Sequence, residues 1–333
     1  MDRVNVIGAG AWGTALAIAA AQEDRQVSLI CRDENQAATI NSTRENSRYL
    51  PDIQIPDAIT AATDLSLIAQ TDILLNVVPA QHLRSNLDLI RPHLAPETAV
   101  VICAKGIEKS TGNLMSDVVN ECLPDQPFAV LSGPNFAHEV AKGLPAATTL
   151  AASSKKLGER LANSLSSSAF RPYYTDDIMG AQLGGAVKNV LAIACGIVAG
   201  ARLGENARAA LITRGMAEIL RLGEKLGARA ETLMGLSGFG DLVLTCSSSA
   251  SRNFSLGEAL GEGRSLEDVL KDRVAVTEGV HTAAALCRLA HQHKIEMPIC
   301  EAVDKLLNTG ASVPTIVEEL LARPIRDESL AGF

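Results

Sequence analysis

The sequence has few aromatic residues and no excess of positive charge. Only 3% of its 333 residues are aromatic, and one of them is tryptophan, which argues against a protein that recognises bases or sugars by stacking. Acidic residues outnumber basic ones by 38 to 30, for a net charge of −8, whereas nucleic-acid-binding proteins usually carry a basic patch. We therefore expect no nucleic-acid partner, and an anionic ligand would depend on a few well-placed cations.

The seven cysteines form no recognisable motif. Their number is odd, and no C-x-x-C pair or Cys/His cluster is present. We therefore predict reduced thiols in a cytoplasmic protein, with neither a disulfide framework nor a metal site. The longest uncharged stretch near the start, residues 4–22, contains three glycines and has the pattern of a strand, a turn and a helix. We expect neither a signal peptide nor an integral membrane segment there.

In the first half of the chain, short apolar runs alternate with helical patterns. The apolar runs cover residues 4–7, 27–31, 73–78, 99–103, 128–131 and 147–151. The helical patterns cover residues 14–22, 34–44, 80–91, 113–122 and 155–166. Most of the apolar runs are continuous, as is typical of strands buried on both faces. The alternation predicts a parallel sheet built from βαβ units.

The second half of the chain has a different pattern of apolar residues. No convincing strand follows Tyr174, and helical patterns cover residues 181–203, 207–226, 255–260, 280–291, 300–307 and 313–321. We place a domain boundary near Thr175–Gly180. The prediction is an α/β fold, with a doubly wound sheet in a first domain over residues 1–178 and an all-helical second domain over residues 179–333.

The segment Gly8-Ala-Gly-Ala-Trp-Gly13 follows the first predicted strand and opens a helix. This is the G-x-G-x-x-G pattern in its required context. Gly8 permits a tight turn, Gly10 lets a pyrophosphate approach the backbone, and Gly13 allows helix and strand to pack closely. The helix N-terminus would supply N–H groups to the phosphates. We predict a dinucleotide site; the alternative is a turn required only for packing.

The end of the second predicted strand bears on the choice of cofactor. An acidic residue at that place would bind the ribose 2′-hydroxyl, but this chain has Arg32, followed by Asp33. An arginine can hold a 2′-phosphate or stack on adenine. Arg32 therefore favours NADPH, while Asp33 leaves NADH open. The alternative for Arg32 is an ordinary solvated surface residue.

Two further segments follow predicted strands. Lys105, in Ile102-Cys-Ala-Lys-Gly-Ile-Glu108, would emerge at the carboxyl end of the sheet, where open α/β sheets bind ligands. Leu131-Ser-Gly-Pro-Asn-Phe136 would turn into a helix whose N–H groups face the same crevice. The alternatives are an exposed loop lysine and simple turn chemistry.

Lys188 lies in the middle of an apolar helix, where a lysine is costly unless it is paired or reaches water. The residues on its face are small, and Gly184 and Gly185 just precede it. Glycines in a helix interior suggest that another helix or a flat ligand approaches closely. We predict a catalytic lysine; the alternative is a helix-packing stripe with a lysine that reaches out to solvent.

The segment Ser237-Gly-Phe-Gly-Asp241 is rich in glycine, and Ser251-Arg-Asn253 follows it. We expect the glycines to give Asp241 an unusual backbone conformation, with a carboxylate that could hold hydroxyl groups. Arg252 would begin a helix, and a guanidinium beside helix N–H groups makes a phosphate site. Ordinary capping and turn motifs are the alternative.

Together these motifs carry a family resemblance. The glycine fingerprint with Trp12 is followed, in order and spacing, by Ala104-Lys-Gly-Ile-Glu108, Ser132-Gly-Pro134, Ala186-Val-Lys-Asn189, Gly238-Phe-Gly-Asp-Leu242, Ser251-Arg-Asn253 and Thr277-Glu-Gly-Val280. Over nearly its whole length the chain resembles bacterial NAD(P)-dependent sn-glycerol-3-phosphate dehydrogenases. The resemblance implies a Rossmann domain followed by an all-helical domain of the 6-phosphogluconate-dehydrogenase type. It also implies reversible reduction of dihydroxyacetone phosphate to sn-glycerol 3-phosphate for phospholipid synthesis.

The resemblance further implies roles for individual residues, with Lys188 as the proton donor and acceptor. The residues implied to bind substrate are Lys105, Gly133, Asn135, Lys188, Asp241, Ser251, Arg252 and Asn253. Those implied to contact the cofactor, beside Gly8, Gly10 and Gly13, are Ala11, Trp12, Arg32, Lys105, Ala137, Arg252, Val276 and Glu278. The chain departs from the family at Asn135, where Ser or Thr is common. Residues 32–33 vary in the family, so the resemblance does not transfer the cofactor preference.

The implied chemistry agrees with the residues. Hydride transfer to the C2 carbonyl creates an alkoxide that needs a proton, and a lysine can supply it if its pKa falls toward neutrality. Burial and Lys105 would lower the pKa of Lys188, and Asp241 would oppose this. Arg252 and helix N–H groups would hold the substrate phosphate and align C2 with the nicotinamide.

Other functions occur on the same architecture. β-Hydroxyacid dehydrogenases and ketopantoate reductases use a lysine and an asparagine three or four residues apart, so that both face one way. Lys188 and Asn189 are adjacent and point about 100° apart, which favours the phosphorylated substrate. A non-catalytic NAD(P) sensor would not need a lysine in an apolar helix. A homodimer is compatible with the apolar helical domain.

Overall fold

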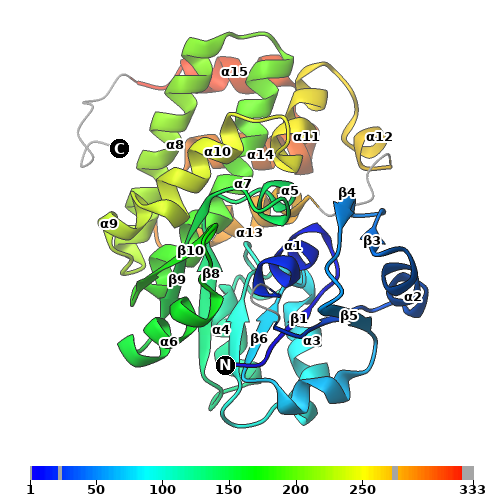
Figure 1. Cartoon of the computed structure of the whole chain (residues 1–333). Helices are drawn as coiled ribbons and strands as arrows, with labels where there is room; N and C mark the ends of the chain where they lie inside the picture. Colours follow the sequence, from blue (N-terminus) through cyan, green and yellow to red (C-terminus); the bar gives the residue numbers. More distant parts are fainter. Residues whose placement is uncertain (1, 22–24, 272–276, 325–333) are drawn as a thin grey trace. The chain divides into compact units, whose positions relative to one another are not determined.

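The computed structural model describes residues 2–21, 25–271 and 277–324, which form two compact units. The first unit contains residues up to Ala104 together with Met115–Ile178. The second contains the short segment Lys105–Leu114 together with the residues from Met179 onward. Lys105 thus belongs to the second unit, although it follows a strand of the first. The two units are described separately below, and Figure 1 gives their elements.

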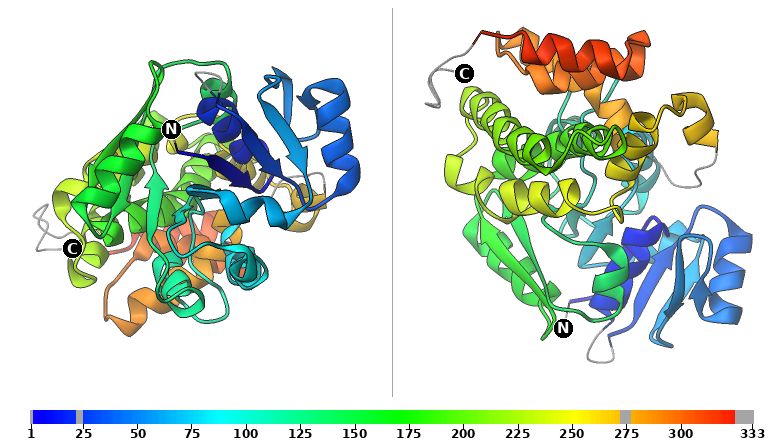
Figure 2. Two further views of the ribbon diagram at one scale, coloured as in Figure 1. Left: turned by 60° about the horizontal axis from the view of Figure 1, so that its bottom comes forward. Right: turned by 90° about the horizontal axis from the view of Figure 1, so that it is seen from above.

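The first unit is built on an eight-stranded sheet with the order β10-β9-β8-β7-β6-β1-β2-β5. The chain runs outward from β1 to β2 and β5, then returns to β6 on the other side of β1 and runs outward again (Figure 2). This confirms the doubly wound prediction, and it places the topological switch point between β1 and β6. The strands are β1 (Val4–Ile7), β2 (Val27–Ile30), β5 (Ile59–Ala62), β6 (Ile73–Asn76), β7 (Ala99–Ile102), β8 (Phe128–Ser132), β9 (Ala146–Ala152) and β10 (Phe170–Thr175).

Most of the sheet is parallel, as predicted, but β9 runs antiparallel to β8, with Ser132 opposite Thr149. The connection between these strands leaves and re-enters the sheet at the same end, so no crossover is made. β10, which pairs with β9, was also missed. It contains Pro172 and exposes Arg171 and Tyr173; a proline is tolerated in an edge strand but breaks the apolar pattern of a buried one.

Helices flank the sheet, and a small hairpin follows the second of them. The helices are α1 (Ala11–Ala20), α2 (Glu34–Thr43), α3 (Leu83–Ile90), α4 (Met115–Cys122), α5 (Ala137–Ala141) and α6 (Lys155–Leu165). The 3-10 turns are η1 (Leu65–Gln70), η2 (Ala80–His82) and η3 (Arg91–His93), and the hairpin strands are β3 (Glu45–Asn46) and β4 (Leu50–Gln54). β3 and β4 pair antiparallel, and neither was predicted from the sequence.

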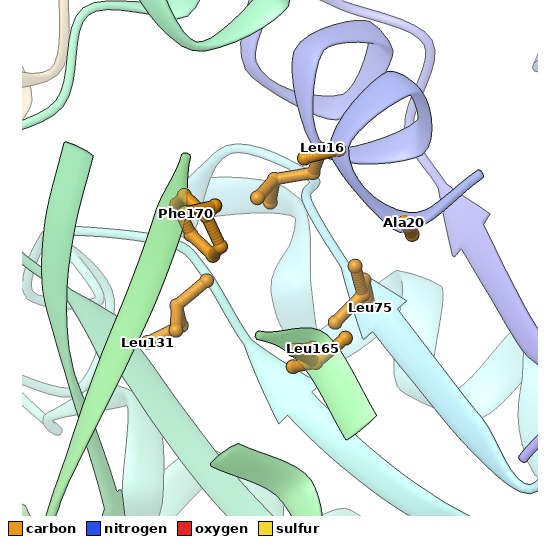
Figure 3. Close-up of a pocket in the computed structure, with 7 residues that line it drawn as sticks. Leu16, Ala20, Leu75, Leu131, Leu165 and Phe170 are labelled. Atoms are coloured by element: carbon orange, nitrogen blue, oxygen red, sulfur yellow. The ribbon is translucent and has the colours of Figure 1, made fainter. Parts of the chain in front are cut away.

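The interior of the first unit is closely packed. A small cavity of about 10 Å³ has an entirely apolar lining. Figure 3 shows the side chains that line it, which come from α1, β6, β8, α6 and the edge strand β10. A space of this size holds about one water molecule and offers it no polar partner. The cavity is therefore a packing gap and not a ligand site. Its lining residues are Leu16, Ala19, Ala20, Leu75, Leu131, Leu165 and Phe170.

The second unit is helical, and its described residues from 179 onward contain no strand, as predicted. α14 and α15 lie side by side (Figure 2, right). Among the described residues, α7 is long and apolar enough to cross a membrane, but 89% of its most apolar stretch is buried within the protein. The elements are α7 (Ile178–Gly200), α8 (Glu205–Lys225), α9 (Ala230–Leu233), the π-turn η4 (Leu236–Gly240), α10 (Asp241–Cys246), α11 (Arg252–Gly261), α12 (Leu266–Lys271), α13 (Glu278–Gln292), α14 (Pro298–Thr309) and α15 (Val313–Leu321).

Small residues let other segments pack directly against the backbone of α7. A Cβ atom added at Gly196 would lie 2.0 Å from the carbonyl oxygen of Phe254 in α11. One added at Gly257 of α11 would lie 2.0 Å from the carbonyl oxygen of Ile193. One added at Gly184 would lie 2.6 Å from the carbonyl oxygen of Ser237. The stripe of small residues on α7 therefore serves packing between segments of the protein.

We predict that Gly196→Ala destabilises the protein by about 1–3 kcal/mol or more, because the new methyl group meets backbone, which cannot rotate away. Gly215→Ala is the matched control, since its Cβ would meet only the flexible side chain of Leu191. Thermal and urea denaturation of both variants provide the measurement. Equal midpoints for the two variants would contradict this description of the contact between α7 and α11.

Candidate active site

The glycine fingerprint of the first unit joins β1 to α1. Gly8 has a φ of +106°, which favours glycine, and a Cβ there would lie 2.8 Å from the carbonyl oxygen of Val77. A Cβ at Gly13 would lie 1.9 Å from the carbonyl oxygen of Gly8. At Gly10, in contrast, no described atom lies within 4 Å of the place of a Cβ. Open space at Gly10, directly before α1, suits the approach of a phosphate to the helix N-terminus.

Two residues beside the fingerprint also suit a dinucleotide. Ala11 and Trp12 begin α1, and the indole nitrogen of Trp12 is buried without a hydrogen-bond partner among the described residues. Buried indole N–H groups usually have a partner. The donor at Trp12, together with the space at Gly10, shows that the residues present fit a bound cofactor.

Arg32 and Asp33 have different tasks after β2. Arg32 is exposed. Asp33 is the N-cap residue of α2, and its carboxylate accepts a hydrogen bond of 2.8 Å from the backbone N–H of Asn35. Capping fixes the position of one oxygen of Asp33, so this carboxylate is committed to the helix that it begins. The structure shows no hydrogen bond between the exposed guanidinium of Arg32 and the other described residues.

The turn after β8 is held tightly. A Cβ at Gly133 would lie 2.7 Å from Oγ1 of Thr148 in β9. The side-chain amide of Asn135 donates to the carbonyl oxygens of Pro134 and Ala147, at 2.8 and 3.0 Å, and its own Oδ1 is buried with no partner among the described residues. Asn135 thus anchors the turn through its two backbone hydrogen bonds. Ala137 is the first residue of α5.

The second unit brings two lysines onto one carboxylate. Nζ of Lys188 donates to Oδ1 of Asp241 at 2.6 Å, and Nζ of Lys105 donates to Oδ2 at the same distance. Asp241 is 1% exposed and Lys188 is 8% exposed. Oγ1 of Thr245 accepts a further hydrogen bond from Lys188, at 2.9 Å. These contacts bring together three residues that lie far apart in the sequence and that the motifs had singled out separately.

The local fold explains how Asp241 reaches this position. Gly184 lies one turn before Lys188 on α7, and the missing side chain lets Ser237 and Gly238 pack against the helix. The π-turn η4 then leads directly into α10, whose first residue is Asp241. Lys188 and Asp241 therefore meet because the glycine beneath them admits the preceding turn.

The expectation of an unusual backbone at Asp241 is wrong. Its φ of −72° and ψ of −31° are ordinary helical values. The neighbouring glycines are needed for close packing, since a Cβ at Gly238 would lie 1.8 Å from the carbonyl oxygen of Leu233. The carboxylate is also occupied by two ammonium groups, and the hydroxyl that it contacts belongs to Thr245, at 3.3 Å.

The pKa of Lys188 is lowered from 10.5 to about 8, mainly because burial removes water from its charged form. The positive charge of Lys105 also contributes to the lowering, and the carboxylate of Asp241 opposes both effects. Because one carboxylate faces two ammonium groups, the attraction is too small to offset the loss of water around Lys188. Lys188 is therefore mostly protonated at neutral pH, yet it can release its proton at little cost.

Hydrogen-bonded side-chain amides connect the cluster to neighbouring helices. Asn189 donates to the backbone carbonyl of Lys105 at 3.2 Å, and Asn253 donates to Oδ1 of Asn189 at 2.9 Å. Oδ1 of Asn253 in turn accepts from the backbone N–H of Gly279 at 3.0 Å. The segment with Lys105 is thereby tied to α7, α11 and the first turn of α13. The side chain of Asn253 therefore links Asn189 in α7 to Gly279 in α13.

The start of α11 is a regular capped helix. The hydroxyl of Ser251 accepts from the backbone N–H of Phe254 at 3.2 Å, and Arg252 is the first helical residue. The side chain of Ser251 therefore caps α11, as the alternative interpretation of this segment predicts. Glu278 is the first residue of α13, whereas Val276 lies outside the described residues.

The structure shows no candidate metal cluster among its described residues. All seven cysteines are free and buried.

Comparison with known proteins decides the family. The model of the N-terminus of NAD-dependent glycerol-3-phosphate dehydrogenases matches residues 3–158, and the model of their C-terminus matches residues 177–318. The chain belongs to the NAD-dependent glycerol-3-phosphate dehydrogenase family.

Individual relatives agree with the family models. The chain is 53% identical over 327 residues to glycerol-3-phosphate dehydrogenase (NAD(P)+) of Parvibaculum lavamentivorans, with 98% of each chain covered. It is 54% identical to the enzyme of the same name from Novosphingobium aromaticivorans, again with 98% of each chain covered. The crystal structure of glycerol-3-phosphate dehydrogenase from Coxiella burnetii superposes with a TM-score of 0.93 at 38% identity, covering 97% of this chain and 99% of that one.

Two residues that contact this lysine and carboxylate cluster, Thr245 and Asn189, were not predicted from the sequence. Thr245 follows Asp241 by four residues, a spacing that places both on one helical face, and this signal was present in the sequence. Asn189 was noticed only as the neighbour of Lys188. Its partners come from Lys105 and Asn253, and periodicity within α7 carries no information about them.

We predict that Asp241→Asn lowers the free energy of unfolding by about 3–5 kcal/mol near neutral pH, because the buried Lys188 and the partly buried Lys105 lose their counter-charge. Loss of Asp241 removes a group that raises the pKa of Lys188, so Lys188 in the variant loses its proton at a lower pH than in the wild type, where its pKa is about 8. The deficit should therefore shrink as the pH rises toward about 8 and change little above it. Urea denaturation across this pH range is the measurement.

Glu319→Gln is the control for this prediction. It breaks an exposed ion pair of similar length, 2.7 Å, with Lys305, and it should cost less than about 1 kcal/mol. A loss for Asp241→Asn that is equally small, or that does not change with pH, would show that the buried cluster contributes no more than a surface pair.

Proposed function

We propose that the protein catalyses the reversible reduction of dihydroxyacetone phosphate to sn-glycerol 3-phosphate with a nicotinamide cofactor, which supplies glycerol 3-phosphate for phospholipid synthesis. Membership of the glycerol-3-phosphate dehydrogenase family supports the reaction. The observation that carries the mechanism is the cluster of Lys188, Asp241 and Lys105, with a buried lysine whose pKa is about 8. Such a group can give a proton to an alkoxide and take it back.

The cofactor would be held mainly by the first unit. When bound, the nicotinamide ring supplies or accepts the hydride at C2 of the substrate. The N-terminus of α1 and the open space at Gly10 suit the pyrophosphate. The remaining residues proposed to contact the cofactor are Gly8, Ala11, Trp12, Gly13, Arg32, Lys105, Ala137, Arg252, Val276 and Glu278.

Lys188 would act at the oxygen on C2. During reduction its ammonium group hydrogen-bonds the carbonyl oxygen and protonates it as the hydride arrives; during oxidation the neutral amine removes the same proton. Asp241 and Thr245 fix the direction of the lysine side chain, which leaves one N–H for the substrate. Lys105 supplies a second positive charge for the developing alkoxide and helps to keep the pKa of Lys188 low.

The substrate phosphate would bind at the start of α11. Arg252 is the first residue of that helix, and both its charge and the helix dipole favour an anion there. Ser251 contributes by capping the helix and so fixing the direction of its first turn. Gly133, Asn135 and Asn253 complete the proposed substrate set; the unpaired Oδ1 of Asn135 suits a substrate hydroxyl.

NADPH is the cofactor that the residues after β2 favour. Arg32 is exposed and can pair with a 2′-phosphate, whereas the carboxylate of Asp33 caps α2. We also place the protein in the cytoplasm, where reduced thiols persist, because all seven cysteines are free. A homodimer stays a prediction.

Lys188→Ala tests the mechanism. We expect kcat for dihydroxyacetone phosphate reduction to fall about 100- to 10,000-fold, the usual contribution of a positioned acid. NADPH binding, followed by quenching of the single tryptophan, should change little. The exposed Lys305→Ala is the control. A near-normal kcat in Lys188→Ala would remove Lys188 from the reaction. If the wild-type enzyme reduced ketopantoate and not dihydroxyacetone phosphate, the proposed substrate would be wrong.

Arg32→Ala tests the cofactor preference. We expect kcat/KM for NADPH to fall about 10- to 100-fold, the value of a charge-assisted contact to a phosphate, while kcat/KM for NADH stays within about threefold. Steady-state kinetics with each cofactor at saturating dihydroxyacetone phosphate give the comparison. A wild-type enzyme that strongly prefers NADH, or a variant that loses both cofactors equally, would contradict the assignment of Arg32 to the 2′-phosphate.

A further inference from the structure

One carbonyl group inside the glycine fingerprint is held by side chains from outside it. The carbonyl oxygen of Ala9 accepts a hydrogen bond of 2.7 Å from Nε2 of Gln36 and one of 3.0 Å from Nδ2 of Asn46. Asn46 is 3% exposed and lies on β3, more than thirty residues after the fingerprint. Burying an amide is costly unless its hydrogen bonds are made. The amide of Asn46 donates to Ala9 and to Thr14, and its Oδ1 accepts from Gln36 at 3.4 Å.

Asn46 makes hydrogen bonds to residues on both sides of Gly10, one inside the fingerprint and one directly after it. Besides Ala9, its Nδ2 donates to Oγ1 of Thr14 in α1 at 2.8 Å. Oγ1 of Thr14 donates in turn to the carbonyl oxygen of Gly10 at 2.9 Å. The amide of Asn46 thus bridges the residue before Gly10 and the first turn after it.

Fixing the Ala9 carbonyl also fixes the N–H of Gly10, because both belong to one planar trans peptide in which they point in opposite directions. Gly10 has no side chain, and open space surrounds the place of its missing Cβ, so its own contacts restrain this peptide little. A glycine without such restraint loses considerable backbone entropy when a ligand orders it. Hydrogen bonds from outside would remove that cost before the ligand arrives.

We propose that Asn46, assisted by Gln36, is a positioning residue for cofactor binding, which presets the Ala9–Gly10 peptide for the pyrophosphate. The proposal rests on the cofactor role proposed for the fingerprint. Asn46 acts through the backbone of Ala9 and touches neither the cofactor nor the reacting atoms. Because the pyrophosphate is common to both cofactors, its effect is the same for NADPH and NADH, unlike that of Arg32.

Asn46→Leu tests the proposal, since leucine resembles asparagine in shape but donates no hydrogen bond. We expect the Kd values of NADPH and NADH to rise about tenfold or more, by the same factor. We expect kcat at saturating cofactor and KM for dihydroxyacetone phosphate to stay within about threefold. Cofactor binding is measured by quenching of the single tryptophan and by calorimetry, and turnover by NADPH oxidation. Asn46→His, which keeps a donor, should recover part of the affinity.

Asn41 provides a matched control. Its side chain also makes two backbone hydrogen bonds, to the carbonyl oxygen and the N–H of Ala61, at 2.8 and 2.9 Å, and it ties α2 to β5 without contacting the fingerprint. Asn41→Leu should lower thermal stability but leave both cofactor Kd values unchanged. If Asn46→Leu changes stability alone, as Asn41→Leu does, the proposal is overturned.

Gln36→Met covers the case in which Asn46→Leu does not fold. Gln36 is only partly buried, so its loss removes one donor from Ala9 at a small structural cost. We expect a severalfold rise in both Kd values, and no rise would overturn the proposal. These outcomes are separate from failure of the proposed function, which would appear as a wild-type enzyme that binds no NADPH or does not reduce dihydroxyacetone phosphate.

Discussion

The second unit is organised around one buried carboxylate that faces two lysines. Asp241 is almost fully buried, and both of its oxygens carry an ammonium group at 2.6 Å. Two positive charges against one negative charge leave the cluster with an excess of positive charge in a poorly hydrated place. Burial lowers the pKa of Lys188 to about 8, and the charge of Lys105 contributes to the lowering, so Lys188 is the group of the cluster that most readily releases a proton. The same excess would attract a developing alkoxide.

Much of the surrounding fold follows from the need to bury this cluster. α7 must be apolar around Lys188 to exclude water. It must also lack a side chain at Gly184, so that η4 can pack against the helix and place Asp241 beside Lys188. Farther along, Gly196 faces the backbone of α11, the helix that begins with Arg252. Gly184 and Gly196 therefore permit the close packing of α7 against the segment that precedes Asp241 and against the helix that begins with Arg252.

The sequence predicted features that repeat locally and missed those that depend on partners. The fingerprint, the strands of the inner sheet and the lone Lys188 in an apolar helix are visible within short windows. The antiparallel β9 and the edge strand β10 were not visible, because strand direction depends on where a connection returns and Pro172 interrupts the apolar pattern. The capping role of Ser251 and the amide contacts of Asn189 also depend on distant backbone, which no period in the sequence encodes.

In both units, side-chain amides hold a backbone segment in place. Asn189 and Asn253 hold the segment of Lys105 in the second unit, and Asn46 and Gln36 hold Ala9 in the first. An amide can donate and accept at once and carries no charge at any physiological pH. A carboxylate in any of these positions would add a charge beside Lys188 or beside a bound pyrophosphate. A framework that does not titrate thus lets Lys188 change its protonation state while the groups around it stay in place.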